Sequence, residues 1–311
     1  MKRVIVTGCC GFIGSHFVER LLKRDDIELI VGIDAMTYAS TKPTIEDDRF
    51  WLLRQRCESI MFDTLCAQHK IDTIIHFAAE THVDNSIVNV QPFVESNIHG
   101  TLSILEGLKR LKHVRLVHVS TDEVFGGDNE LRDESSAYAP TNPYAATKAS
   151  SDHLVRAFAL TFDLRCVVTH CTNNFGPRQH EEKLIAKTIS RVMSGESIPI
   201  YGNGMQRRDW LFVDDHCHAI ELICDTDFTR DTFCISTGVL RTNLEVVRTI
   251  IDFMNRDEDL IEFVDDRPAH DLQYRLDSSK VRRELSWNDD YEFEDALRFT
   301  IDTECRRAGW R

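Results

Sequence analysis

The sequence has no long hydrophobic run and no excess of basic residues. A membrane-spanning helix needs about 20 consecutive apolar residues, and the 311-residue chain contains no such run. Lys and Arg number 37 against 51 Asp and Glu, so the net charge is −14. Nucleic-acid binding needs a basic surface, and this balance therefore argues against a nucleic-acid partner. The first residues lead directly into an apolar strand, so we expect no signal peptide and no membrane partner.

Metal-binding and disulfide spacings are also missing. None of the ten cysteines forms a C-x-x-C pair, and the only close pair is Cys9-Cys10. Scattered cysteines in apolar surroundings are typical of reduced thiols in a cytoplasmic protein, and we expect no metal site. Internal repeats and low-complexity linkers are absent as well.

Apolar strands and amphipathic helices alternate through the first half of the chain. This alternation predicts a doubly wound parallel sheet (Rossmann) over residues 1–175. Residues 176–311 are richer in turns and charge, and predict a smaller C-terminal α/β domain that binds substrate. Whether segments at about 208–237 return to the first domain is left open. Strands are expected at 3–7, 29–33, 71–78, 114–119 and 167–171, and a short strand with a Gly-Asn-Gly turn at 198–204. A helical pattern follows Gly14 and runs through Leu22, and further helices are expected at 92–108 and 143–162.

A glycine-rich turn follows the first expected strand. Gly8, Gly11 and Gly14 have the spacing that lets a backbone turn tightly, approach a pyrophosphate and pack a helix on a strand. Asp34 ends the second expected strand about 20 residues later, where an acid binds the adenosine ribose. A carboxylate repels a 2′-phosphate and no Arg or Lys follows closely. We therefore predict NAD rather than NADP.

Several proton-transfer groups are expected at one edge of the sheet. Thr121, Asp122 and Glu123 follow a buried strand, at the edge where open α/β sheets bind ligands. Tyr144 and Lys148 are four residues apart and share one face of a helix. Two adjacent acids are more than a simple redox step requires, although a solvated strand end or helix cap is the alternative interpretation of this pair.

Two alanines and two arginines cannot be assigned a function from their own neighbourhood in the sequence. Ala78 and Ala79 end a strand and permit close approach of a cofactor, but they fit an ordinary core equally well. Arginines bind diphosphate well because the guanidinium is bidentate. Taken singly, Arg208 and Arg267 are more simply explained as solvated surface charges.

With these motifs in place, the chain resembles the extended short-chain dehydrogenases, and within them the nucleotide-sugar 4,6-dehydratases. The Tyr-x-x-x-Lys pair is shared by the whole superfamily, whereas the Thr-Asp-Glu triplet separates dehydratases from C4 epimerases and decarboxylases. Matching stretches run nearly from end to end, at residues 7–15, 76–84, 120–126, 142–154, 173–177, 182–185, 208–213 and 266–268.

The resemblance implies a role for each matching position. Catalytic roles fall on Thr121, Asp122, Glu123, Tyr144 and Lys148. NAD contacts fall on Gly8, Gly11, Phe12, Ile13, Gly14, Asp34, Thr37, Ala78, Ala79, Thr81, Tyr144, Lys148 and Asn174. Nucleotide-sugar contacts fall on Thr121, Asn173, Lys183, Leu184, Tyr201, Arg208, Asn243, Arg267 and His270. The family also implies a homodimer joined through two long helices of each subunit, which fits the helices at 92–108 and 143–162.

The chain departs from the family pattern at a few positions. Cys9-Cys10 stands where a small residue is usual, and Ala35 replaces a basic residue. Gln55 takes the place of an aspartate that meets the adenine, and Ala269 that of a glycine. These changes bear on single cofactor and substrate contacts rather than on the catalytic set.

The implied reaction is dehydration of a nucleotide-glucose to its 4-keto-6-deoxy form. Tyr144 takes the C4 hydroxyl proton with help from Lys148, Glu123 removes the C5 proton, and Asp122 protonates the departing C6 hydroxyl. Thr121 binds the C4 oxygen. Two neighbouring acids suit opposite protonation states, because each raises the pKa of the other.

Substrate identity stays open at this level. We favour dTDP-glucose, with UDP-glucose or a UDP-N-acetylhexosamine as alternatives, because a single methyl distinguishes the bases only weakly. A nucleotide-sugar C4 epimerase would need the tyrosine and lysine but not the acid pair. A non-catalytic NAD-binding regulatory protein would be expected to lose the tyrosine or the lysine.

Overall fold

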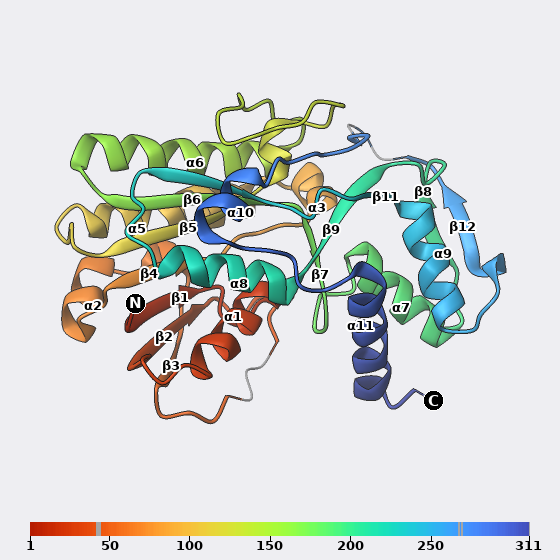
Figure 1. Ribbon diagram of the computed structural model, residues 1–311, viewed down its shortest axis with the longest axis horizontal. Coiled ribbons are helices and arrows are strands. Elements are labelled where there is room, and N and C mark those ends of the chain that lie inside the picture. The colour runs from red at the N-terminus through yellow and green to blue at the C-terminus, as the bar shows by residue number, and fades with distance from the viewer. Residues whose placement is uncertain (42–44, 267, 269, 311) are drawn as a thin grey trace.

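A parallel sheet of seven strands forms the centre of the molecule, in a computed structural model that describes residues 1–41, 45–266, 268 and 270–310 (Figure 1). The strand order is β10-β6-β5-β4-β1-β2-β3, and every neighbouring pair is parallel. The central strands are buried along almost their whole length, as sheets covered on both faces require. The predicted doubly wound sheet is confirmed.

The sheet strands are β1 (Arg3–Thr7), β2 (Leu29–Asp34), β3 (Phe50–Arg54), β4 (Thr73–His76), β5 (Arg115–Thr121), β6 (Arg165–Cys171) and β10 (Asp231–Ile235). The first-half helices are α1 (Phe12–Leu22), η1 (Cys57–Ser59), α2 (Phe62–His69), α3 (Val83–Val88), α4 (Gln91–Phe93), the π-helix η2 (Val94–His99), α5 (Gly100–Leu108), η3 (Asp122–Phe125) and α6 (Pro143–Phe162). The later strands are β7 (Asn173–Phe175), β8 (Ile198–Tyr201), β9 (Arg207–Phe212), β11 (Leu240–Thr242) and β12 (Ile261–Val264). The later helices are α7 (Leu184–Ser194), α8 (Val213–Cys224), α9 (Asn243–Phe253), η4 (Glu258–Leu260), α10 (Ser279–Leu285) and α11 (Phe293–Ala308).

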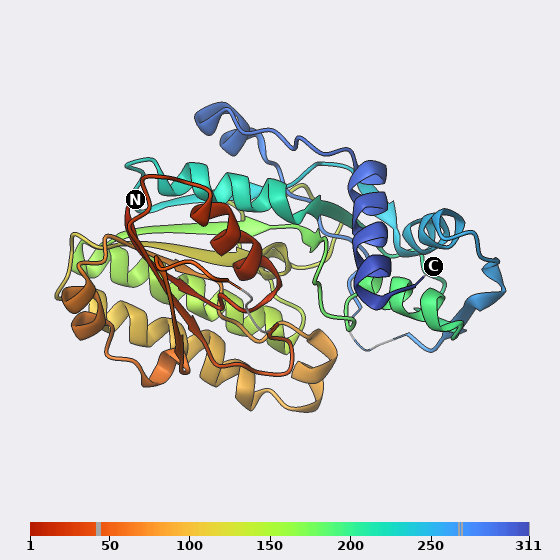
Figure 2. The same ribbon diagram turned by 90° about the horizontal axis from the view of Figure 1, so that it is seen from below.

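Helices cover both faces of the large sheet. Helix α1 packs beside α8 on one face, while α2, α5 and α6 lie side by side on the other (Figure 2). The chain moves outward from β1 in both directions, to β2 and β3 on one side and to β4, β5 and β6 on the other. The order therefore reverses between β1 and β4, and the crevice above such a reversal is where open α/β sheets bind ligands.

The second half of the chain contributes to two regions. Strand β10 pairs with β6 and extends the large sheet, and α8 covers that sheet. Strands β7, β9 and β11 form a three-stranded sheet, and β8 pairs with β12. Helices α7, α9 and α11 surround these small sheets at the far end of the molecule (Figure 1).

Some elements differ from the prediction in their limits. Helix α6 has the predicted bounds, but the predicted helix at 92–108 is interrupted by the π-helical segment η2. Strand β4 is shorter than the predicted 71–78, because the chain leaves the sheet after His76. Strand β3 is half exposed and was not predicted.

Among the described residues, no helix combines the length and apolar character that crossing a membrane requires.

Candidate functional site

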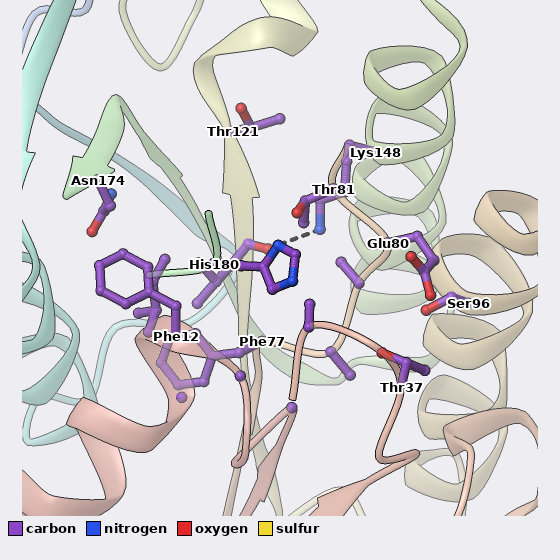
Figure 3. A pocket seen from close by; sticks show the side chains of 18 of the residues that line it. Phe12, Thr37, Phe77, Glu80, Thr81, Ser96, Thr121, Lys148, Asn174 and His180 are labelled. Atoms are coloured by element: carbon purple, nitrogen blue, oxygen red, sulfur yellow. Dashed lines mark hydrogen bonds between the residues drawn. The ribbon is translucent and has the colours of Figure 1, made fainter. Parts of the chain in front are cut away.

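A cleft of about 300 Å³ opens above the reversal between β1 and β4. Its lining comes from the carboxyl ends of β1, β2, β4, β5 and β6, and from helices α1 and α6. In Figure 3, Phe12, Thr121, Lys148 and Asn174 surround one space, although they come from different parts of the chain. The large sheet therefore gathers residues that are far apart in sequence into one site.

The glycine turn forms the floor of this cleft. Gly8 has φ +67°, a conformation that side chains disfavour. A Cβ added to Gly14 would lie 2.1 Å from the Gly8 carbonyl oxygen, so helix α1 can begin this close to β1 only without a side chain there. Both positions therefore need glycine for structural reasons.

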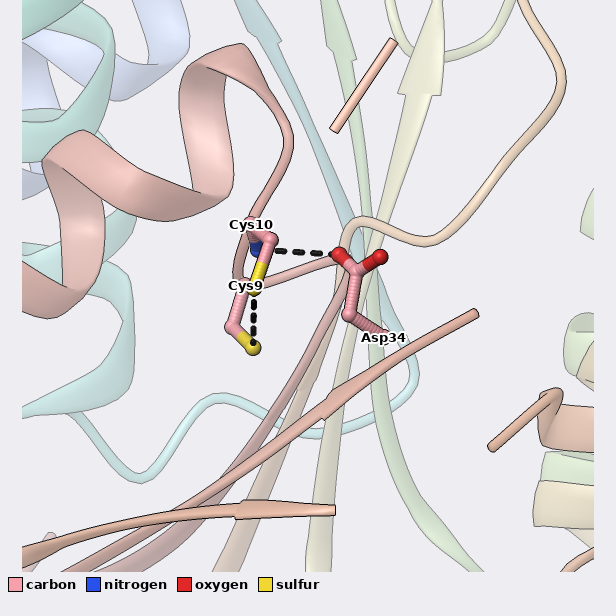
Figure 4. Close-up of side chains that lie close together, drawn as sticks. All are labelled: Cys9, Cys10 and Asp34. Carbon is pink, nitrogen blue, oxygen red and sulfur yellow. Dashed lines mark hydrogen bonds between the residues drawn. The ribbon is translucent and has the colours of Figure 1, made fainter. Parts of the chain in front are cut away.

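Asp34 connects the glycine turn to the loop that follows β2. Its carboxylate accepts from the Cys10 N–H at 2.9 Å (Figure 4), the Met36 N–H at 2.8 Å and the Ser40 hydroxyl at 2.8 Å. A carboxylate has about four acceptor positions, so capacity remains for one further donor from the cleft.

The two cysteines of the turn are packed beneath it. Their sulfur atoms lie 3.8 Å apart, and both side chains are buried (Figure 4). The hydrogen bond with Cys10 and burial raise the pKa of the Cys9 thiol, so it stays protonated. These residues fill the space between the turn and β2, where Cys9 faces Gly32.

The end of β5 and the turn η3 present the three polar residues of the triplet. The Thr121 hydroxyl donates to Asp122 at 3.2 Å and accepts from the Glu123 N–H at 3.3 Å. Asp122 is buried. Burial, followed by the charge of Glu123, raises the pKa of Asp122 well above its ordinary value, and Arg208 opposes this rise. The buried site therefore favours the protonated form of Asp122.

Helix α6 begins at a residue that also reaches the acid pair. Asn142 caps the helix by accepting from the Ala145 N–H at 2.9 Å, and its amide donates to Glu123 at 3.2 Å. Pro143 at the first helical position suits a helix start. One residue therefore fixes the start of the helix that carries Tyr144 and orients the neighbouring carboxylate.

Tyr144 and Lys148 lie on the buried face of α6. Burial and then the charge of Glu123 raise the pKa of Tyr144 well above its ordinary value, whereas a hydrogen bond from Thr121 lowers it. Burial lowers the pKa of Lys148, and Asp152 opposes this. The Lys148 ammonium donates to the Val119 carbonyl at 2.9 Å. Without further positive charge nearby, Tyr144 is therefore a phenol, and its ionisation to the phenolate requires such a charge.

The cleft brings together every residue predicted for catalysis or cofactor binding. It also includes three predicted for the sugar nucleotide: Asn173, Lys183 and Thr121, the last of which belongs to the catalytic set as well. The remaining predicted substrate contacts do not line it: Leu184, Tyr201, Arg208, Asn243 and His270. Arg267 and the neighbouring Ala269 lie outside the described residues. The roles of all these residues stay predictions.

Several of the predicted substrate contacts already have partners within the chain. The Arg208 guanidinium donates to the carbonyls of Arg207, Leu272 and Asp271 at 2.8–3.3 Å, beneath the Tyr274 ring. The Tyr201 hydroxyl donates to Asp84 at 3.2 Å. Arg208 is therefore buried and fixed in place, and its positive charge lowers the pKa of Asp122.

Several residues that line the cleft were not predicted. Arg56 and Glu58 follow β3, which was not predicted, and their charged groups lie 3.8 Å apart. His180 and Glu182 follow β7 and contact Tyr38, whose hydroxyl donates to Glu182 at 3.0 Å. The loop after β2 thus meets the loop after β7 across the cleft.

Comparison with known proteins gives full-length matches. The family model for GDP-mannose 4,6 dehydratase matches residues 5–300. A dTDP-glucose 4,6-dehydratase of Mycobacterium tuberculosis is 41% identical, over 99% of this chain and 95% of that protein. A dTDP-glucose 4,6-dehydratase of Neisseria meningitidis serogroup B is 38% identical, over 100% of this chain and 95% of that protein.

A solved structure matches the fold equally completely. DesIV, a dTDP-glucose 4,6-dehydratase of Streptomyces venezuelae with NAD and TYD bound, superimposes with a TM-score of 0.94 and 37% identity. The match covers 99% of both chains.

Proposed function

The chain belongs to the nucleotide-sugar 4,6-dehydratases of the extended short-chain dehydrogenase family, and on that premise we propose that it dehydrates dTDP-glucose to the 4-keto-6-deoxy sugar with NAD as cofactor. The observation that carries this proposal is the buried, protonated Asp122 beside Glu123, in one cleft with Tyr144 and Lys148. A C4 epimerase has no need of the two acids, and a non-catalytic binding protein has no need of the tyrosine and lysine.

The cleft fits a dinucleotide on its own geometry. A side chain at Gly14 would collide with the Gly8 carbonyl and distort the glycine turn at the cleft floor, and Asp34 retains an acceptor position for a ribose hydroxyl. Asn174 lines the cleft, and its buried side-chain oxygen has no hydrogen-bond partner among the described residues. When bound there, NAD would supply the hydride acceptor for oxidation at C4, the donor for reduction at C6, and the positive charge of its oxidised ring.

Tyr144 is the proposed base at C4. Its phenol must lose a proton before it can accept one from the sugar hydroxyl, and burial opposes that loss. Lys148 lies one helical turn away and places an ammonium in the same cleft. The pair therefore becomes an effective base only when further positive charge enters the site.

Asp122 and Glu123 divide the elimination between them. Glu123 accepts the C5 proton, which the neighbouring C4 ketone makes acidic, and Asp122 delivers a proton to the C6 hydroxyl as it leaves as water. Burial keeps Asp122 protonated for this task, and the amide of Asn142 orients Glu123. General acid and base groups of this kind each contribute roughly 10²–10⁴-fold in rate.

One proton must be moved between turnovers. Glu123 returns its proton to C5 as C6 is reduced, so each cycle leaves a proton added to Tyr144 and one removed from Asp122. The Thr121 hydroxyl donates a hydrogen bond to Asp122 at 3.2 Å, and its hydrogen bond with Tyr144 lowers the pKa of that phenol. Thr121 therefore contacts both groups. We assign to Thr121 both the contact with the C4 oxygen and the return of this proton.

A single turnover with dTDP-glucose tests the proposal. NADH absorbance should appear and then decay, and the product should be lighter than the substrate by one water. A transient followed by an unchanged product mass would favour the epimerase, and no transient at all would favour a binding protein. UDP-glucose and a UDP-N-acetylhexosamine, assayed in parallel, would establish the nucleotide and the sugar.

We further propose a homodimer that forms through α5 and α6 of each subunit. The outer face of α6 exposes small residues together with Leu160, which is 71% exposed. Leu160→Glu should convert the dimer to a monomer in light scattering, and a monomeric parent protein would contradict the proposal. A cytoplasmic location is proposed as well, and the ten free cysteines support it.

A further inference from the structure

A polar cluster lies buried behind Tyr144 and Lys148, and we call it the Asp152 cluster. It consists of His118, Ser120, Tyr138, Asp152 and His170, and Asp152 and both histidines have no exposed surface. The Ser120 hydroxyl donates to Asp152 Oδ2 at 2.8 Å, and the Tyr138 hydroxyl donates to the same oxygen at 3.0 Å. His170 Nε2 lies 3.1 Å from Oδ2, and His118 Nε2 lies 3.1 Å from Oδ1.

These contacts keep Asp152 ionised within the protein core. Burial alone would favour the neutral acid, but the contacts with His118 and His170 outweigh it and hold the pKa of Asp152 below its ordinary value. Burial lowers the pKa of His118 to about 4, so this ring is neutral at physiological pH. A buried carboxylate is strongly destabilising unless charge and hydrogen bonds balance it, and the neutral His118 ring supplies a hydrogen bond but no charge.

Lys148 is positioned to provide the cation. It precedes Asp152 by four residues, so the two side chains share one face of α6. They also reach adjacent residues of β5, because the Lys148 ammonium donates to the Val119 carbonyl and Asp152 accepts from Ser120. Both side chains are almost fully buried, at 4% and 0% exposure, so water screens little of their attraction.

We propose that Asp152 is a positioning residue for the oxidation step, because its carboxylate is the counter-charge that keeps Lys148 an ammonium beside Tyr144. Burial lowers the pKa of Lys148, and the charge of Asp152 opposes that effect. The remainder of the Asp152 cluster holds the carboxylate in its ionised form. Asp152 does not line the cleft and therefore acts only through Lys148.

Other titratable groups also face Tyr144 and Lys148. They are Asp122 and Glu123 of η3, His76 of β4, His118 of β5 and Cys171 of β6. The two acids and Cys171 raise the pKa of Tyr144. An ammonium at Lys148, which lines the same cleft, would favour the phenolate. The charge state of Lys148 therefore bears on whether Tyr144 can act as a base.

Asp152→Asn tests this assignment by removing the charge at nearly constant volume. The ionisation of Tyr144 is measured from its tyrosinate absorbance in the full chain saturated with NAD, as the difference between each variant and the same variant with Tyr144→Phe. The proposal predicts that ionisation shifts to higher pH by at least one pH unit. NADH formation at neutral pH should then slow roughly ten-fold or more and recover as the pH rises.

Two other results would overturn the proposal. A shift of Tyr144 ionisation to lower pH would mean that Asp152 acts directly on the phenolate as a like charge. An unchanged ionisation would mean that Asp152 is only structural. Tyr138→Phe is the matched control, because it removes one donor but retains the carboxylate, and it should leave Tyr144 ionisation unchanged.

A double variant covers the case in which Asp152→Asn fails to fold. Lys148→Met combined with Asp152→Asn removes both charges, so it should fold and should be more stable than Asp152→Asn alone. A double variant no more stable than Asp152→Asn would overturn the charge pairing. The proposal rests on the proposed function, but tyrosinate titration needs no turnover, so failure to form the dehydrated product would be distinguished from failure of this pairing.

Discussion

Tyr144 and Glu123 act on different bonds of the sugar in this account, although they lie in one cleft. Tyr144→Phe should abolish NADH formation, because the C4 hydroxyl loses its base. Glu123→Gln should still allow NADH to form but should block its decay, because the C5 proton stays in place. Rapid-mixing absorbance of a single turnover separates the two phases, and equal loss of both phases in Glu123→Gln would contradict the assignment.

Asp122 gives the elimination step its own pH dependence. Because its pKa is raised, Asp122 keeps its proton at pH values where an ordinary carboxyl group is ionised. The proton is lost as the pH rises through that raised pKa. The decay of NADH should therefore slow with rising pH, whereas its formation should speed up as Tyr144 ionises. Asp122→Asn should abolish the alkaline dependence of the decay, and persistence of that dependence would assign it to another group.

Asn142 has two structural roles: it caps helix α6 and it orients Glu123. Asn142→Ala should cost about 1 kcal/mol of stability, which lowers Tm by roughly 2–4 °C in a protein of this size. Asn142→Ser retains a capping oxygen and loses only the amide, so it should keep most of the stability while elimination slows. Equal stability loss in both variants would show that the cap contributes little.

The glycine turn can be tested by two alanine substitutions. Gly14→Ala places a Cβ 2.1 Å from the Gly8 carbonyl, whereas Gly11→Ala places one 3.2 Å from the same oxygen. The first should weaken NAD binding by more than ten-fold, because the turn must move away from the cleft floor, and the second should weaken it less. Fluorescence titration with NAD gives both affinities, and the reverse order would contradict the geometry.

Sequence patterns predicted the elements of the first half well and the contacts of the second half poorly. Helix α6 has the predicted limits, because a capping Asn, a Pro at the first turn and apolar periodicity all agree. Strand β3 is a short, partly exposed run with the sequence Phe-Trp-Leu-Leu-Arg that was not assigned as a strand, and Arg56 beyond it was missed. The backbone partners of Arg208 depend on long-range packing against residues 271–272, which spacing alone does not reveal. The division into two domains stays a prediction.

At the scale of the whole molecule, buried histidines should make stability depend on pH. His216 of α8 is fully buried, neither ring nitrogen has a hydrogen-bond partner among the described residues, and burial lowers its pKa to about 3. Because this pKa lies below the unfolded value of about 6.5, the stabilisation is complete above pH 6.5 and is lost as the pH falls towards 3. At pH 5 the loss amounts to about 2 kcal/mol.

Denaturant unfolding at pH 8 and pH 5 checks this expectation. His216→Leu should lose less stability between the two pH values than the parent protein does. His218→Leu, at a partly exposed position on the same helix, is the control and should follow the parent protein. Equal pH sensitivity in all three proteins would exclude His216 as a source of acid lability.

One cleft is proposed to oxidise C4, eliminate water and reduce C6 of the same sugar. The most direct test uses dTDP-glucose deuterated at C4 and mass spectrometry of the product with fragment assignment. We expect a product that is lighter by one water and carries the deuterium at C6. A product of unchanged mass, or a dehydrated product without deuterium at C6, would contradict it.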